Sequence, residues 1–146
     1  MKKNALLHLI ELARRARDDA AQRVAGAHHE VSRARNTLDT LATYRQEQWR
    51  AAAQRSRTDP ALLRIRDVFG RKLDGAIAEQ RATCDTLHEA LERQRLALND
   101  RQRRLLAWET MQARRDAADA ERQRRTEQRA TDEQAARMVQ RRNRGV

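Results

Sequence analysis

The stretch Leu73–Trp108, LDGAIAEQRATCDTLHEALERQRLALNDRQRRLLAW, decides the fold of this chain. Its apolar residues return after three and then four positions, which is the seven-residue repeat of a coiled coil. Eight of the eleven positions on this spacing are apolar: the eleven are Leu73, Ile77, Gln80, Cys84, Leu87, Leu91, Gln94, Leu98, Arg101, Leu105 and Trp108. The repeat predicts a long helix that packs one stripe of side chains against a second helix.

A second stripe with the same spacing lies upstream, and nine of its twelve positions are apolar. They are Ile10, Ala13, Arg17, Ala20, Val24, Ala27, Val31, Ala34, Leu38, Leu41, Arg45 and Gln48. Helix breakers cluster between the stripes at residues 55–60, RSRTDP, where Asp59 can cap a helix whose first residue is Pro60. We therefore predict an all-α fold, an antiparallel two-helix coiled-coil hairpin. Its helices cover about 5–54 and 60–140, with a turn over about 55–59.

The two stripes fit each other in one register. Facing residues of an antiparallel pair have numbers with a nearly constant sum, and a sum of 114 or 115 matches both stripes. It pairs Leu41 with Leu73, Leu38 with Ile77, Val31 with Cys84, Val24 with Leu91 and Ile10 with Leu105. The polar stripe positions Gln80, Gln94 and Arg101 fall opposite Ala34, Ala20 and Ala13. Their long stems can lie over these small residues while their heads reach water.

This register leaves a C-terminal helical overhang. Met1 falls opposite residue 113 or so, and residues after about 114 have no partner helix from this chain. The stripe is also lost there, since positions 112, 115 and 119 are Gln, Arg and Asp. Residues 101–146 carry thirteen Arg and seven acidic residues, a net +6 of the chain's +11. We expect a basic helix that is marginally stable alone and orders best against a partner.

The composition agrees with a thin helical rod of one domain, residues 1–146. The aromatic share is 3%, and 26 residues are alanine, so the chain cannot fill a thick globular core. Four Gly and one Pro leave too few turns for a β-sandwich or a βαβ fold. A charged share of 36% is also typical of disorder, but the sustained heptads favour the coiled coil.

The sequence predicts no catalytic, cofactor or metal site. It has no Gly-rich phosphate loop, and His28 and His29 point about 100° apart on a helix, so they cannot chelate together. Cys84 lies on the stripe, which favours a small packed side chain over a nucleophile. A single cysteine fits a reducing cytosol. No apolar run reaches the length of a membrane span, and His8 and Glu11 interrupt the N-terminal apolar run, which argues against a secretion signal.

Two classes of function remain from the residues alone, a rod that docks into protein partners and a basic nucleic-acid binder. The basic C-terminal region suits phosphate neutralisation. However, acidic residues are interspersed along it, and it carries no aromatic platform for stacking bases beyond Trp108. We therefore expect protein partners and no nucleic acid, DNA included.

Three blocks of the sequence stand out: Leu9–Ala13 (LIELA) with Asp19–Ala21, Leu38–Glu47 (LDTLATYRQE) with Arg50 behind it, and Arg103–Gln112 (RRLLAWETMQ). Together they resemble the FliJ family, small coiled-coil stalk proteins of the bacterial flagellar type III export apparatus. The order of the blocks, the chain length and the turn position all match, and the resemblance covers nearly the whole chain. The stalk of a virulence type III injectisome is a related alternative, and the blocks around Tyr44 and Trp108 favour the flagellar family.

The resemblance implies a non-enzymatic stalk that lies in the central pore of the hexameric export ATPase, FliI. It also implies a link to the export gate membrane protein, FlhA, and the handling of empty export chaperones. Such a protein is cytoplasmic, and its partners hold it at the cytoplasmic face of the inner membrane. The family stalk is similar to the coiled coil of the ATP synthase γ subunit.

The family's gate-binding surface can be carried over onto this sequence. It falls on Thr37, Leu41, Tyr44, Gln48, Phe69, Leu73, Ala76 and Gln80. Thr37, Gln48 and Gln80 depart from the family's usual residue types, which are a Gln, an aromatic and a His. Leu41 and Leu73 are also stripe positions, so packing between the helices is an equal explanation for them. Tyr44 and Phe69 lie off the stripe, and the register places Tyr44 beside Phe69 or Gly70.

Overall fold

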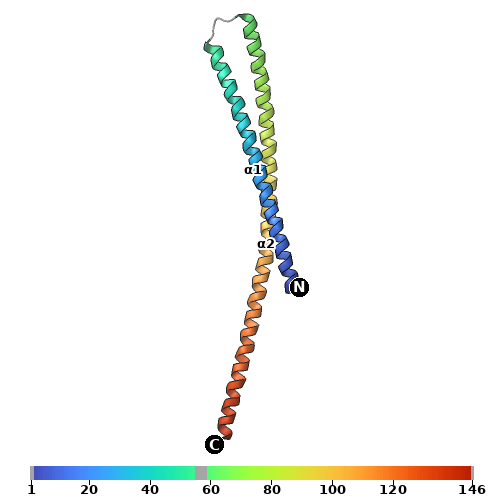
Figure 1. The fold of residues 1–146 in the computed structure, drawn as a ribbon, viewed down its shortest axis with the longest axis vertical. Helices are drawn as coiled ribbons and strands as arrows, with labels where there is room; N and C mark the ends of the chain where they lie inside the picture. Colours follow the sequence, from blue (N-terminus) through green and yellow to red (C-terminus); the bar gives the residue numbers. More distant parts are fainter. Residues whose placement is uncertain (1, 55–58, 146) are drawn as a thin grey trace. The chain divides into compact units, whose positions relative to one another are not determined.

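The computed structural model describes residues 2–54 and 59–145, which form two helices, α1 (Lys3–Gln54) and α2 (Pro60–Arg144) (Figure 1). These residues include no strand, and the long-range contacts between α1 and α2 confirm the predicted helical hairpin. Relative to the expected ranges, α1 begins two residues earlier and α2 ends four residues later. Residues 55–58 of the predicted turn lie outside the described residues. Neither helix has a stretch apolar enough to cross a membrane, within the residues described.

The start of α2 follows from the residues Asp59 and Pro60. The Asp59 carboxylate accepts a hydrogen bond from the Ala61 amide at 3.1 Å, and its backbone carbonyl accepts from the amides of Leu62 and Leu63. These bonds occupy amides that have no partner within the helix. Pro60 has no amide hydrogen to satisfy, so it fits the first helical position. The predicted cap is therefore confirmed.

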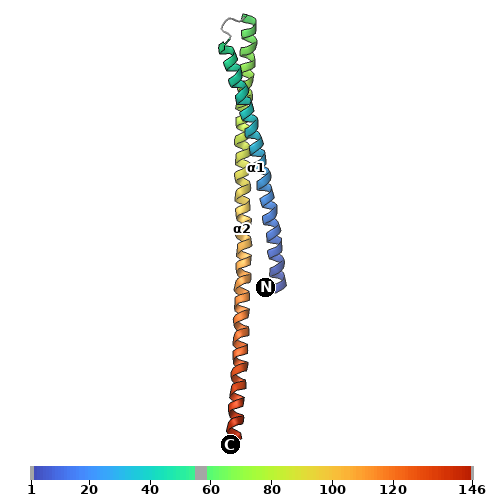
Figure 2. The same ribbon diagram turned by 60° about the vertical axis from the view of Figure 1, so that its left-hand side comes forward.

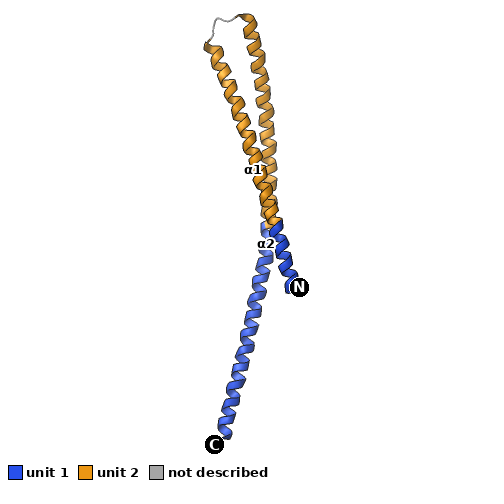
Figure 3. Cartoon of the chain, in the orientation of Figure 1, with its two compact units in different colours: residues 1–15, 102–146 blue, residues 16–101 orange. Residues whose placement is uncertain are grey.

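The chain divides into two compact units, which are described separately (Figure 3). Unit 2 is residues 16–101, and unit 1 is residues 1–15 and 102–146. In unit 2, α1 and α2 run antiparallel side by side in both ribbon views (Figures 1 and 2). Unit 1 combines the first turns of α1 with the C-terminal part of α2.

Unit 2 has a narrow core in which small residues alternate with larger ones. Its buried apolar residues are Ala20, Val31, Ala34, Leu73 and Leu91. The Gln80 amide donates a hydrogen bond to the Ala34 carbonyl at 3.0 Å, which confirms that these two residues face each other. The head of Gln80 thus binds the backbone of α1, whereas the sequence predicted that it reaches water. Alanine brings the α1 backbone within reach because it has no side chain beyond Cβ.

In unit 1 the core consists of Leu6, Ile10 and Leu105, and the partly buried Ala13 and Trp108 pack against it. This cluster confirms that Ile10 lies opposite Leu105. Arg14 and Glu109 form an ion pair across the two helices at 3.3 Å.

The pairing in unit 1 continues past residue 114. A groove next to Leu6 is lined by Lys3 and Leu7 of α1 and by Gln112, Arg115, Asp116 and Asp119 of α2. Helical side chains tilt toward the N-terminus of their own helix. In an antiparallel pair, the first side chains of α1 therefore lean along α2 toward its C-terminus, while those of residues 115–119 lean back. The overhang thus begins after Asp119, about five residues later than expected.

The stripes predicted from the sequence are the faces that become buried. All twelve positions of the first stripe are buried or half-buried, and so are ten of the eleven positions of the second. The exception is Arg101, which is exposed. A guanidinium retains its water unless a partner compensates for the loss, so the Arg101 side chain extends into solvent.

Candidate partner-binding surfaces

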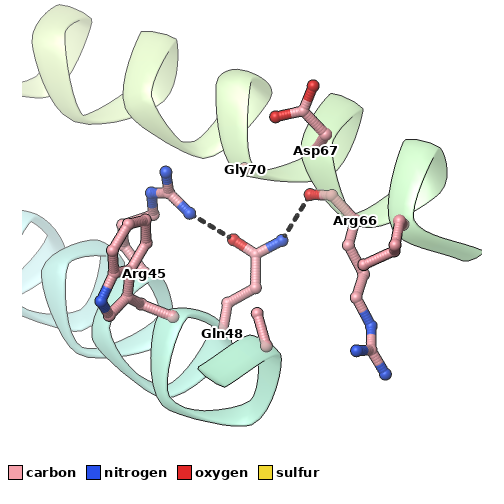
Figure 4. Close-up of a pocket in the computed structure, with 8 residues that line it drawn as sticks. Arg45, Gln48, Arg66, Asp67 and Gly70 are labelled. Atoms are coloured by element: carbon pink, nitrogen blue, oxygen red, sulfur yellow. Dashed lines mark hydrogen bonds between the residues drawn. The ribbon is translucent and has the colours of Figure 1, made fainter. Parts of the chain in front are cut away.

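A polar cluster joins the helices at the end of unit 2 where α1 ends and α2 begins. The Arg45 guanidinium donates to both carboxylate oxygens of Asp74, at 2.8 and 3.2 Å, and to Gln48 Oε1 at 2.9 Å. Gln48 Nε2 in turn donates to the Arg66 carbonyl at 2.9 Å (Figure 4). Hydrogen bonds thus hold the helices together where the stripe loses its apolar residues.

Gly70 lets the Arg45 side chain lie directly over the α2 backbone, and an added Cβ would force the guanidinium to shift. A Cβ at Gly70 would lie 2.7 Å from Arg45 Nη1 and 3.2 Å from Gln48 Oε1. The absent side chain leaves room for the guanidinium, and Arg45 also lies 5.8 Å from the ring centre of Trp49. A groove of about 260 Å³ lies beside this cluster, with Leu63, Arg66 and Asp67 on its α2 side (Figure 4).

The eight residues predicted for gate binding all lie in unit 2, but they differ in what they offer a partner. Tyr44 and Phe69 are 56% and 54% exposed, so their aromatic rings are available for contact. Thr37 is exposed, while its hydroxyl donates to the Arg33 carbonyl at 3.1 Å. Leu73 is 8% exposed and Leu41 is half-buried, which places both in the packing between the helices.

The remaining three predicted residues are half-buried at the edge of the helix pair. The side-chain amides of Gln48 and Gln80 donate hydrogen bonds to backbone carbonyls of the opposite helix, those of Arg66 and Ala34 respectively. Ala76 offers only a methyl group. A partner approaching this surface would therefore meet the two exposed aromatic rings, whereas the amides of Gln48 and Gln80 are already hydrogen-bonded between the helices.

Sequence reasoning missed several exposed apolar residues near the same end of unit 2. Trp49 is 68% exposed, and Leu62, Ile65 and Val68 are 48%, 64% and 52% exposed. The α2 residues were readable from the sequence, because Leu62, Ile65 and Phe69 follow a 3–4 spacing of their own. This second spacing is offset from the stripe that packs on α1.

The C-terminal part of α2, residues 120–144, is exposed along almost its whole length. Residues 121–145 carry eight Arg and four acidic residues, a net charge of +4. Glu121 pairs with both Arg124 and Arg125, at 2.7 and 3.1 Å, one turn along the same helix. Arg141, Arg142 and Arg144 lie in the last turn, where positive charge interacts favourably with the helix dipole.

The described residues contain no group of three or more His, Cys, Asp or Glu side chains placed to hold a metal ion. His28 and His29 are exposed, and Cys84 is a half-buried free thiol on the stripe.

The geometry defines a class of protein: a two-helix coiled-coil hairpin whose longer helix continues as an exposed basic segment. The chain belongs to the FliJ family, because the family model described as Flagellar FliJ protein matches residues 1–144. It is therefore a component of the flagellar protein export apparatus. A search of curated proteins found no significant match.

Proposed function

We propose that this chain is a non-enzymatic stalk that links the export ATPase to the export gate. The exposed C-terminal part of α2 inserts into the central opening of the ATPase hexamer, and unit 2 binds the cytoplasmic region of the gate protein FlhA. The same rod handles empty export chaperones. Its partners hold it at the cytoplasmic face of the inner membrane. Family membership supports the apparatus, and the single observation that supports the stalk is the unpaired length of α2.

The unpaired part of α2 suits insertion into a ring. About 25 residues of helix extend roughly 37 Å at 1.5 Å per residue, and a single helix is slender enough for a narrow opening. An isolated helix of this composition is marginal in water, so a surrounding partner stabilises it. Its net charge of +4 favours an acidic lining in the partner.

The gate contact is proposed for the surface built from Tyr44 and Phe69. Aromatic side chains are enriched among the residues that dominate binding energy at interfaces. This chain has four aromatic residues in total, and three of them are exposed in unit 2. Gln48 and Gln80 join the two helices by hydrogen bonds, and Thr37, Leu41, Leu73 and Ala76 complete the surface.

Truncation after Ala120 tests the ATPase contact. We expect the truncated chain to keep the cluster of Leu6, Ile10 and Leu105, because the groove next to Leu6 extends along α2 only as far as Asp119. Stimulation of the purified ATPase hexamer should be lost, whereas the full chain should stimulate the hexamer and hydrolyse no ATP alone. A Tyr44→Ala variant serves as the control that retains the C-terminal helix and should still stimulate. Full stimulation by the truncated chain would place the ATPase contact elsewhere on the hairpin.

A further inference from the structure

The first ten residues of α2 have their apolar face on the wrong side for the hairpin. Four large apolar side chains, which we call the apolar arc, are Leu62, Ile65, Val68 and Phe69. Each is between 48% and 64% exposed. The corresponding positions toward α1 hold the half-buried Arg66 and the buried Gly70. An arginine and a glycine therefore face the other helix here, with Leu63 in the groove beside them, whereas the apolar arc faces outward.

The apolar arc forms one continuous surface. Successive residues of a helix are rotated by about 100°, so these four side chains lie within an arc of roughly 120°. A surface of this kind, on one convex helix, is well suited to a flat and deformable partner.

Positive charge borders the apolar arc. Residues 60–72 contain four cations and one acidic residue, Asp67. The Asp67 carboxylate is in an ion pair with Arg71 at 2.6 Å. Arg64 and Lys72 are exposed beside the arc, and their long stems let the charges reach past its apolar residues.

We propose that the apolar arc binds the surface of an anionic lipid membrane. Apolar residues on one face of a helix with Lys and Arg beside them are the pattern of an interfacial helix, which lies in the headgroup region. The cations add attraction to anionic headgroups. This inference goes beyond the proposed function, in which only partner proteins hold the chain at the membrane.

Vesicle co-sedimentation of the full chain tests this proposal. The chain should sediment with vesicles of phosphatidylglycerol and phosphatidylcholine, and much less with phosphatidylcholine alone. A chain of net charge +11 also binds anionic vesicles without specificity, so the deciding variant leaves the charge unchanged. The double variant Ile65→Gln, Val68→Gln should weaken binding at least about tenfold through lost apolar burial. It spares Phe69 and hence the proposed gate contact.

The matched control is Leu96→Gln, because Leu96 is on the same helix and equally exposed, at 67%. This variant should bind vesicles like the unchanged chain. The double variant Arg64→Gln, Lys72→Gln should weaken binding by about fivefold per charge at low salt. Circular dichroism of each variant should show unchanged helicity, since all five substituted residues are exposed.

Three outcomes would overturn the proposal. The first is equal vesicle binding by the Ile65 and Val68 double variant and by Leu96→Gln, which would show non-specific attraction to charge. The second is no vesicle binding by the full chain. The third is loss of gate capture by the double variant with vesicle binding intact, which would assign the apolar arc to a protein partner. Failure of the ATPase test with normal vesicle binding would instead contradict only the proposed function.

Discussion

Replacing Leu91 by aspartate should strongly destabilise unit 2. Leu91 is 2% exposed and is one of the largest fully buried side chains described. Its removal forfeits about 1.5–3 kcal/mol of apolar burial. The new carboxylate must either lose its water between the two helices or distort the helix pair to reach solvent. We therefore expect a total cost of about 3–4 kcal/mol. For a domain near this size, that corresponds to a fall in Tm of about 10 °C.

The control is Leu96→Asp, five residues further along the same helix, where the side chain is 67% exposed. Both variants change the charge and the helix propensity by the same amount, so their difference isolates burial. We expect Leu96→Asp to cost less than about 1 kcal/mol. Urea unfolding, monitored by circular dichroism, gives the change in unfolding free energy for both variants, provided that the dependence of this free energy on urea concentration is the same. Equal midpoints for the two variants would mean that the stripe does not hold the hairpin together.

The glycines of unit 2 should respond differently to alanine. Gly26→Ala and Gly75→Ala, where nothing lies within 4 Å of the added Cβ, should each stabilise the chain by about 1 kcal/mol. Gly70→Ala should gain much less, because its Cβ displaces the Arg45 guanidinium; an equal gain at all three in thermal melts would contradict the packing around Arg45. At the proposed gate surface, Tyr44→Ala and Phe69→Ala should weaken capture of the gate's cytoplasmic region and leave the melts unchanged, since both rings are more than half exposed. Parallel loss of helicity and binding would show that the rings serve the fold.

The candidate surfaces were only partly predictable. The resemblance to the family named Tyr44 and Phe69, and their exposure agrees with a contact role that is still to be tested. It gave no hint of the cluster joining Arg45, Asp74 and Gln48, because these hydrogen bonds depend on how closely two distant segments approach. The hydrogen-bond partner of Gln80 could not be predicted for the same reason. A glutamine side chain opposite an alanine can reach either water or the backbone of the other helix, and the distance between the helices decides which it binds.

The sequence by itself determined the helices, their pairing and their polarity along the chain. Heptad spacing is a local property, and it specified which face of each helix is buried, from Ile10 to Trp108. The breaker at Asp59 and Pro60 likewise acts within one turn of helix.

Only the tertiary structure decided where the pairing stops and what the surface offers. Because side chains of both helices tilt toward each other at this end, the pairing of α1 with α2 in unit 1 extends to Asp119. At the other end of α2, the approach of Arg45 to Gly70 placed polar groups between the helices, and Leu62, Ile65 and Val68 remained outside. A periodic pattern predicts that a face is apolar, but whether that face is covered depends on the position of the neighbouring helix.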